Sequence, residues 1–233
     1  MTGRLRPGVL LDVDGTLVDT NYLHALAWSR ALRSVGEWSP MNAIHRLVGM
    51  GGDQLVPKLL GHACPEAIEA RPGFFKALVD EARAFPCAAA FVRAMSSSGL
   101  AVVLATSAPD EELEVLLELL NVTEAVVAKT TADDVTESKP APEVFLKAME
   151  RGSLDPQRSL AIGDSIWDIM AARAAGVGCI AVETGGFSRH ELGESGALCV
   201  YKDVGELLDQ FWTSPLALLA LNASRDPAHR AED

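Results

Sequence analysis

Apolar and polar positions along most of this chain form a repeating order of predicted helices and strands. Short apolar runs that end in polar residues, such as Leu100 to Ala105, predict buried strands, and apolar residues at helical spacing predict helices between them. From residue 86 onward we expect helices near 88–97, 110–120, 142–151 and 166–175. We expect strands at 100–106, 124–128, 159–163 and 177–182. This alternation is typical of a parallel sheet with crossover helices.

The amino-terminal third has a different pattern. Gly8 to Leu11 is an apolar run that predicts a first buried strand, whereas residues 21–84 carry helical spacing broken by glycines and prolines, with no convincing strand. The predicted fold class is therefore α/β, with a Rossmann-like parallel sheet core at 1–18 and 85–213 and an all-helical insert at 19–84. We expect hinges near 17–20 and 83–86, and a partly disordered C-terminal tail at 214–233.

Two acidic residues end the first strand. Asp12 and Asp14 are two positions apart, so their side chains project to the same side at the carboxyl end of the strand. Paired carboxylates repel each other and need a cation or a shared proton. The arrangement predicts a site for a hard cation such as Mg²⁺. Asp19, a little further on, is interpreted as a helix-start residue.

Three later segments carry chemistry of the same kind. Thr106 and Ser107 end the strand predicted at 100–106, Lys139 lies between prolines, and Asp164 and Asp168 follow the strand predicted at 159–163. Phosphoryl transfer needs a nucleophile, cations around the phosphate oxygens and a group that moves a proton at the leaving oxygen. The sequence offers a candidate for each role. Taken alone, Lys139 is typical of a solvated loop and Asp164 of a helix N-cap.

In this order, the four segments resemble the four motifs of the haloacid dehalogenase-like hydrolase superfamily, in its phosphatase branch with a helical cap. The resemblance spans about residues 8–205. It implies that Asp12 is the nucleophile and a Mg²⁺ ligand. It implies that Asp14 is the general acid and base, with a backbone carbonyl that binds the metal.

The resemblance also implies roles for the other motif residues. Thr106 and the Ser107 backbone would bind phosphate, Lys139 would bridge nucleophile and phosphoryl group, Asp164 would bind Mg²⁺, and Asp168 would act through water or by orienting Asp164. The helical insert would be a cap that closes over the site and contacts the substrate.

Several reaction classes share this pattern. The favoured function is a Mg²⁺-dependent phosphatase that hydrolyses a small-molecule phosphomonoester through an aspartyl-phosphate, similar to phosphoglycolate phosphatases. The alternative is a mutase that resembles β-phosphoglucomutase, but such relatives use a cap arginine where this chain has Gly49 to Gly52. A dehalogenase would lack Asp14, and a non-catalytic binding module would have lost one of the motif residues.

Two features of the insert are left open. The loop Gly49 to Gly52 could meet the substrate or serve only as a helix junction. His24 and Trp28 are one helical turn apart and resemble positions that face the active site in sugar-phosphate mutases. The other interpretation is a packed tryptophan with a surface histidine.

Composition narrows the partners and the setting. The net charge of −12 argues against nucleic acid but allows a small anionic substrate, because the local charge of a site matters more than the total. The four scattered cysteines predict neither a zinc site nor disulfides, and Cys87 and Cys179 have apolar neighbours typical of small core residues. Asp12 ends the first apolar run too soon for a secretory signal, and no run is long enough to span a membrane. We expect a cytoplasmic protein that is a monomer or a weak homo-oligomer.

Overall fold

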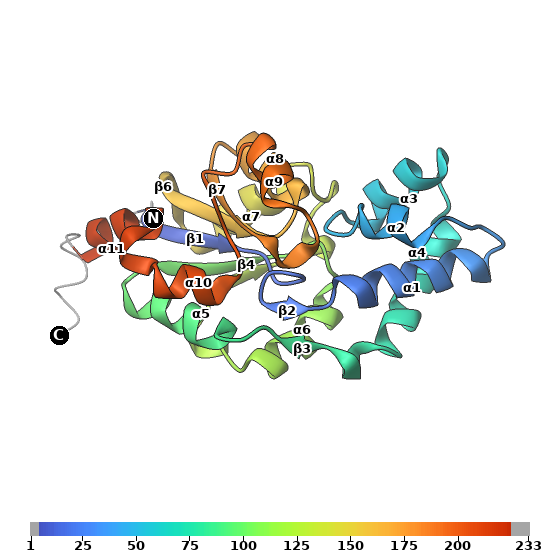
Figure 1. Cartoon of the computed structure of the whole chain (residues 1–233), viewed down its shortest axis with the longest axis horizontal. Coiled ribbons are helices and arrows are strands. Elements are labelled where there is room, and N and C mark those ends of the chain that lie inside the picture. Colours follow the sequence, from blue (N-terminus) through green and yellow to red (C-terminus); the bar gives the residue numbers. More distant parts are fainter. Residues whose placement is uncertain (1–4, 225–233) are drawn as a thin grey trace.

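A computed structural model describes residues 5–224 of the chain and shows a six-stranded parallel sheet between two layers of helices (Figure 1). The strand order is β5-β4-β1-β6-β7-β8. The sheet comprises β1 (Arg6–Leu11), β4 (Ala101–Ala105), β5 (Ala128–Thr130), β6 (Leu154–Gly163), β7 (Gly178–Val182) and β8 (Cys199–Tyr201). The predicted α/β fold with a Rossmann-like parallel sheet is confirmed.

The central strand β1 is buried on both faces, as its unbroken apolar run predicts. Val9 and Leu11 point into one core cluster and Leu10 into the other. Helices cover each face: the first face by α5 (Ala88–Ser97), α6 (Asp110–Leu120) and α10 (Val204–Asp209), and the second by α7 (Glu143–Gly152), α8 (Ile166–Ala174) and α9 (Arg189–Glu194).

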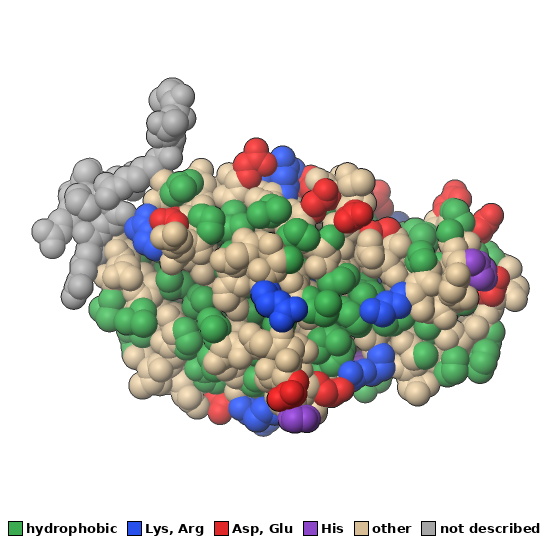
Figure 2. Space-filling view, turned by 90° about the horizontal axis from the view of Figure 1, so that it is seen from above, with side chains coloured by type: hydrophobic (Ala, Val, Ile, Leu, Met, Phe, Trp, Pro, Cys, Tyr) green, Lys and Arg blue, Asp and Glu red, His purple; other side chains and the backbone are tan. Residues whose placement is uncertain are grey.

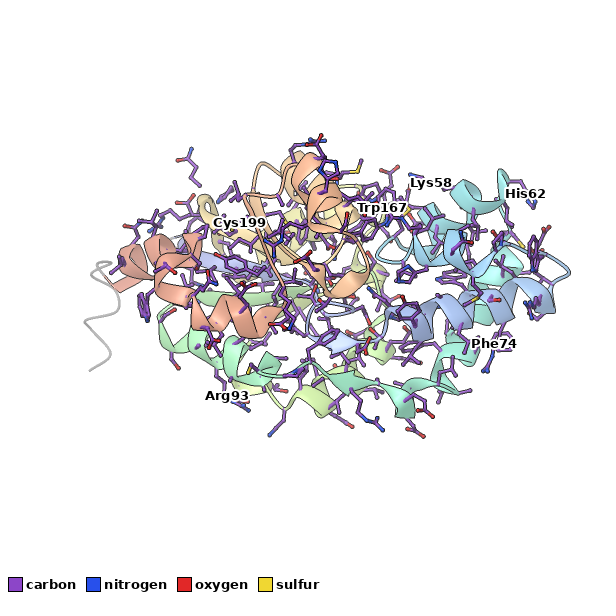
Figure 3. The ribbon with its side chains drawn as sticks, in the orientation of Figure 1. Lys58, His62, Phe74, Arg93, Trp167 and Cys199 are labelled. Atoms are coloured by element: carbon purple, nitrogen blue, oxygen red, sulfur yellow. The ribbon has the colours of Figure 1, made fainter. Side chains whose placement is uncertain are left out.

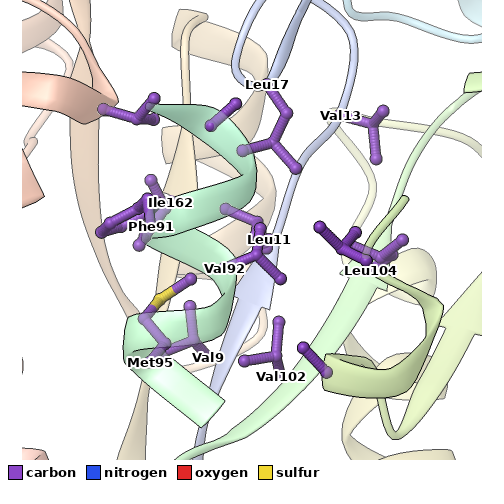
Figure 4. Packing of buried hydrophobic residues seen from close by; sticks show 14 of the residues in the cluster. Val9, Leu11, Val13, Leu17, Phe91, Val92, Met95, Val102, Leu104 and Ile162 are labelled. Carbon is purple, nitrogen blue, oxygen red and sulfur yellow. The ribbon is translucent and has the colours of Figure 1, made fainter. Parts of the chain in front are cut away.

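Helix α5 illustrates how the larger cluster is packed. Phe91, Val92 and Met95 are spaced along one face of the helix and lie against Val9 and Leu11 of β1 (Figure 4). All five side chains are fully buried. Complete burial of a side chain as large as Phe91 stabilises the fold by about 2 kcal/mol.

Between β2 (Val18–Asp19) and β3 (Arg83–Ala84), which pair as a short antiparallel ribbon, the chain leaves the core. We call residues 21–81 the helical insert. It contains α1 (Asn21–Ser34), α2 (Met41–His45), α3 (Gly52–Leu60), α4 (Pro65–Lys76) and the 3₁₀ turn η1 (Val79–Glu81), and it extends to one side of the sheet in Figure 1.

The insert has its own apolar cluster, which reaches the core. Ala25, Trp28 and Leu32 of α1 pack with residues of α3 and with Trp167, the second residue of α8. Their spacing follows one face of a helix. Tyr22 of the same helix is exposed and stacks on His45 of α2.

Some sequence predictions need correction. The strand predicted at 124–128 begins later, because residues 123–125 form a 3₁₀ turn before β5. Asp19 does not begin a helix: it is an exposed residue of β2, and α1 starts at Asn21. Cys87 is exposed at a positive φ of 66°, whereas Cys179 is buried as predicted.

The C-terminal segment also differs from its prediction. Residues 215–224 are not a tail but helix α11 (Pro215–Ser224), which follows the 3₁₀ turn at Phe211–Thr213. Leu216 and Ala220 are buried in the larger core cluster beside β1. The segment is apolar at most of its positions, so its sequence carries no helical periodicity that would mark a buried side. The rest of the predicted tail, 225–233, lies outside the described residues.

Charged side chains are dispersed on the one face that Figure 2 draws. On the face drawn in Figure 2, lysines and arginines lie scattered among acidic side chains and do not form a basic patch. Within residues 5–224, no helix is both long enough and apolar enough to cross a membrane.

Candidate active site

The candidate site lies where the strand order of the sheet reverses. The sheet extends from β1 to β4 on one side and to β6 on the other, which leaves a crevice at the carboxyl ends of β1 and β6. Asp12 directly follows β1, and Asp164 directly follows β6. The Asp12 amide donates to the Ile162 carbonyl at 3.0 Å, so adjacent strands bring the two carboxylates to one edge.

Lys139 is the counter-charge of this edge. Its Nζ lies 2.6 Å from Asp12 Oδ1, 2.8 Å from the Ala105 carbonyl and 2.8 Å from Asp168 Oδ1. Burial disfavours the charged amine, but Asp12 and Asp168 outweigh that effect and raise the pKa of Lys139. A solvated loop lysine is therefore the wrong interpretation, since the side chain is fully buried with three acceptors.

Asp164 is held by two side chains that the sequence analysis did not single out. Thr16 Oγ1 lies 3.2 Å from Asp164 Oδ1 and 3.0 Å from Asp12 Oδ2, and Asn21 Nδ2 donates to Asp164 Oδ2 at 2.8 Å. Gly15 makes room for them: at its φ of +76°, an added Cβ would lie 2.4 Å from Asp164 Oδ2. Asp164 is not the N-cap of α8, because that position belongs to Ser165.

Asp168 is fixed from two sides. Its amide donates to Ser165 Oγ at 3.3 Å, and its Oδ2 accepts from the Ser165 amide at 3.2 Å, which forms a reciprocal capping box. The other oxygen faces Lys139. Asp168 therefore contacts the lysine directly, and Asp164 is oriented by Thr16 and Asn21 instead.

Asp14 accepts hydrogen bonds from three side chains. Thr20 Oγ1 donates at 2.7 Å, Thr106 Oγ1 at the end of β4 donates at 3.1 Å, and His24 Nε2 lies at 2.7 Å. Burial raises the pKa of the Asp14 carboxyl. The neighbouring His24, its hydrogen bond, the Thr20 hydroxyl and the Arg71 charge together outweigh burial and lower that pKa well below the usual value. Ser107, beside Thr106, lines a cavity between the core and the insert.

A buried chain of polar groups continues from Asp14 into the insert. Arg71 of α4 donates through Nη2 to His24 Nδ1 and through Nη1 to Glu112 of α6. Because a guanidinium can only donate, His24 Nδ1 is the acceptor, and Nε2 carries the hydrogen that bonds Asp14. A surface histidine is therefore the wrong interpretation of His24, which is 5% exposed. Nothing in the local sequence marks Arg71 or Glu112.

The carboxylates are suited to a divalent cation. Asp12, Asp164 and Asp168 are buried, and one oxygen or more of each lies within 4.8 Å of the others. Burial raises the pKa of Asp12 to about 7. The charges of Asp168 and Asp14 also raise this pKa, whereas Lys139 lowers it. Burial and the charges of Asp12 and Asp168 also raise the pKa of Asp164. Three buried carboxylates whose oxygens lie this close together offer the hard oxygen ligands that Mg²⁺ prefers.

The helical insert closes over this edge of the sheet. It meets the core through an ion pair between Arg46 and Glu191 at 2.5 Å and through Trp167 Nε1, which donates to the Arg46 carbonyl at 3.3 Å. Lys58 of the insert lies 4.3 Å from the centre of a Trp167 ring, and Figure 3 shows both side chains at this junction.

A cavity of about 300 Å³ remains between the insert and the core. Asp12, Asp14 and Thr106 line it from the core, and His24 and Trp28 line it from the insert. The glycine loop contributes too: Gly49, Met50 and Gly52 line the cavity, and Gly52 begins α3, so the loop is a helix junction. Contact between this loop and the substrate stays a prediction. At Gly49, a Cβ would lie 2.9 Å from Ser165 Oγ, so the loop approaches the core closely.

Comparisons with known proteins agree with this geometry. A family model for the haloacid dehalogenase-like hydrolases matches residues 7–176. The phosphoglycolate phosphatase of Rhodospirillum rubrum is 29% identical over 216 residues, which cover 86% of this chain and 89% of the relative. A hydrolase structure from Pseudomonas syringae has 30% identity and a TM-score of 0.83, covering 88% of this chain and 98% of that one. CbbY from Rhodobacter sphaeroides, solved in complex with phosphate, has 26% identity and a TM-score of 0.72, with 87% and 96% covered.

The matched segment contains all four motifs, from Asp12 and Asp14 to Asp164 and Asp168. The resemblance inferred from those motifs is therefore confirmed, including the phosphatase branch. The chain belongs to the haloacid dehalogenase-like hydrolase family.

Proposed function

We propose that the protein is a Mg²⁺-dependent phosphatase that hydrolyses a small-molecule phosphomonoester through an aspartyl-phosphate on Asp12. One observation carries the proposal. Asp12 and Asp14 line the same cavity, Lys139 is hydrogen-bonded to Asp12, and the Thr106 hydroxyl is hydrogen-bonded to Asp14. The cavity volume of about 300 Å³ suits a small ligand.

Asp12 supplies the nucleophile in this proposal. One of its oxygens forms a bond to phosphorus while the bond from phosphorus to the alcohol oxygen breaks. Lys139, held on Asp12 Oδ1, favours the ionised carboxylate and places a positive charge where the phosphoryl oxygens gather negative charge. The Thr106 hydroxyl and the Ser107 amide would bind the phosphate oxygens.

Asp14 manages the protons in both halves of the reaction. It gives a proton to the departing alcohol oxygen and then takes one from the water that attacks phosphorus and frees Asp12. A phosphate dianion next to Asp14 raises the pKa of that carboxyl, which favours its loading with a proton before the first step. The hydrogen bonds from His24 and Thr20 favour the ionised form that the second step needs.

A bound Mg²⁺ would be held by the carboxylates of Asp12 and Asp164 and the backbone carbonyl of Asp14, with Asp168 beside them. The ion would neutralise charge on the phosphoryl oxygens and orient them. The cluster of three buried carboxylates supports this assignment. Thr16 and Asn21 would keep Asp164 in place for it.

The names of relatives support a phosphatase over a mutase. Phosphoglycolate phosphatases recur among the curated relatives, and CbbY was solved with phosphate. The mutase alternative is not favoured, since the loop Gly49 to Gly52 lacks an arginine. Arg46, close by in the chain, pairs with Glu191 and packs on the Phe187 ring instead of lining the cavity.

We also infer the class of substrate, the cellular location and the oligomeric state. The acidic net charge of −12 favours a small substrate over nucleic acid. We keep the expectation of a cytoplasmic protein that is a monomer or a weak homo-oligomer.

The proposal is tested by phosphate release from a panel of phosphomonoesters with Mg²⁺ and with EDTA, together with the variant Asp12→Asn. We expect release that EDTA abolishes and that Asp12→Asn lowers by about 1,000-fold or more. Asp19→Asn, which makes the same change at an exposed position of β2, should keep full activity. Metal-independent release, or an active Asp12→Asn variant, contradicts the proposal. Isomerisation of β-glucose 1-phosphate without phosphate release would favour the mutase.

A further inference from the structure

The cavity over Asp12 has one permanently cationic side chain among the described residues that line it, and that side chain is already neutralised. Arg71 reaches the cavity from α4 of the insert. Its guanidinium is paired with Glu112 of α6, and both side chains are 9% exposed. The same guanidinium lies 4.9 Å from the centre of the Phe75 ring, so packing as well as charge holds it.

The remaining charges of the lining have the opposite sign. Apart from Asp12 and Asp14, the lining includes the carboxylates of Asp53 and Asp133 at exposed positions. Asp53 accepts a hydrogen bond from the Ser138 amide at 3.0 Å, and Asp133 accepts one from the Asp110 amide at 2.8 Å. These backbone bonds fix both carboxylates near the cavity, and neither pairs with a lysine or arginine among residues 5–224.

Much of the other lining is apolar. It includes Trp28, Val48, Met50, Ile68, Pro109 and Val135. A carboxylate or a second phosphate on the leaving alcohol would lose water here without gaining a free cation, and it would face Asp53 and Asp133. Burial of an unpaired charge is costly, whereas burial of an uncharged group against apolar walls is favourable.

We infer that the substrate is a phosphomonoester whose leaving alcohol is uncharged. This inference rests on the proposed function and narrows its substrate class. It separates this chain from the phosphoglycolate phosphatases that it resembles, because the leaving alcohol of phosphoglycolate carries a carboxylate. Glu112 is the residue that sets the preference: it does not line the cavity, but it neutralises the cation that could bind a second anion.

Two matched pairs of substrates test the inference in the full chain with Mg²⁺. The first is 2-hydroxyethyl phosphate against 2-phosphoglycolate, and the second is glycerol 3-phosphate against 3-phosphoglycerate. In each pair a hydroxymethyl group replaces a carboxylate. We expect kcat/KM to favour the uncharged member by about tenfold or more.

Glu112→Gln removes the negative charge but keeps a polar side chain beside Arg71. In both pairs, this variant should lower the ratio of kcat/KM for the uncharged member to kcat/KM for the anionic member by about fivefold. The reason is that the Arg71 charge becomes available to an anion. Glu111→Gln, one residue earlier on α6 and exposed, is the matched control and should leave the preference unchanged. If Glu112→Gln does not fold, Asp53→Asn provides the second variant and should shift the preference in the same direction.

The outcomes separate the two claims. Equal or faster hydrolysis of the anionic members by the wild-type protein overturns the inference and leaves the phosphatase function standing. A folded Glu112→Gln variant with an unchanged preference also overturns it. If the protein hydrolyses none of the four esters and no ester of the wider panel, the proposed function itself is overturned.

Discussion

Lys139 and Asp12 are 127 residues apart in the chain and meet with 2.6 Å between Nζ and Oδ1. Both are buried, and Asp168 holds the lysine from the other side at 2.8 Å. The ammonium thus joins the end of β1 to the start of α8. Among the described residues, it is the one buried positive charge in direct contact with the carboxylates at this edge. It therefore affects stability as well as chemistry.

Replacement of Lys139 should destabilise the fold when no metal compensates. With EDTA present at pH 8, we expect Lys139→Met to lower the free energy of unfolding by about 3 kcal/mol, because it leaves buried carboxylates unpaired. The pKa of Asp12 is raised in the folded state, so its buried negative charge destabilises the fold at high pH. This destabilisation disappears as the carboxyl takes up a proton. The loss should therefore be smaller at pH 5.

Urea unfolding at the two pH values measures this difference. Lys147→Met is the control, because Lys147 is partly exposed and pairs only with Glu150 at the surface. It should change the free energy by no more than about 0.5 kcal/mol. Equal stability of Lys139→Met and the wild type at pH 8 would show that Lys139 is not the counter-charge described here.

His24 should matter through Asp14. His24→Phe keeps a ring against Phe75, whose centre is 4.3 Å away, but removes the hydrogen bond to Asp14. We expect kcat to fall by about 100-fold with a smaller effect on KM. Loss of the donor raises the pKa of Asp14, so the acidic limb of the pH–rate profile should move to higher pH.

The pH dependence of kcat separates this effect from a general loss of packing. His24→Gln, which restores a donor, should recover part of the activity and return the acidic limb toward its original position. His62→Phe, at an exposed position of the insert, serves as the control and should behave as the wild type. An unshifted acidic limb in His24→Phe would remove the link between His24 and Asp14.

Trp167 of α8 packs in the apolar cluster of the helical insert. It is 6% exposed, packs among residues of the insert and bonds the Arg46 carbonyl. Trp167→Ala should lower the free energy of unfolding by about 3 kcal/mol. Trp212→Ala removes a tryptophan that is 65% exposed and should cost about 1 kcal/mol or less. Similar losses in the two variants, measured by urea unfolding, would argue against the packing of Trp167 at this junction.

Glu191 reports on the docking of the insert. The Ser188 amide and hydroxyl, followed by Arg46, lower the pKa of the Glu191 carboxyl to about 2. Arg46→Gln removes the contribution of the insert, so the pKa should rise but stay below 4.5, since Ser188 still donates. The stability that this carboxylate contributes is present above pH 4.5 and is lost as the pH falls through 2. An NMR titration of Glu191 that is identical in both proteins would contradict the docked arrangement.

Much of the fold could be predicted because its signals are local. The apolar run of β1 and the helix-and-strand order after residue 86 reflect burial along short segments. The motif carboxylates were found for the same reason: Asp12 and Asp164 directly follow strands, and parallel strands end at a common edge. Helix α11 was missed, because a short apolar segment near the chain end carries no periodicity that separates a packed helix from a tail.

The supporting contacts could not be predicted, because they join distant parts of the chain. Asn21 bonds Asp164 across 143 residues, and Arg71 pairs with Glu112 across 41. Read from the sequence alone, Asn21, Arg71 and Glu112 are ordinary polar residues of helices. Thr16 had a weak signal, since it lies within the first motif beside Gly15. Only the folded arrangement shows which carboxylate each of them holds.

In the proposed mechanism, Asp12 carries the phosphoryl group during turnover. A crystal structure of the protein with Mg²⁺ and beryllofluoride, a mimic of an aspartyl-phosphate, tests it most directly. We predict beryllium bonded to a carboxylate oxygen of Asp12, with Lys139 and Thr106 around the fluorides. Beryllofluoride bonded to another residue, or bound with equal occupancy in Asp12→Asn, would contradict the account.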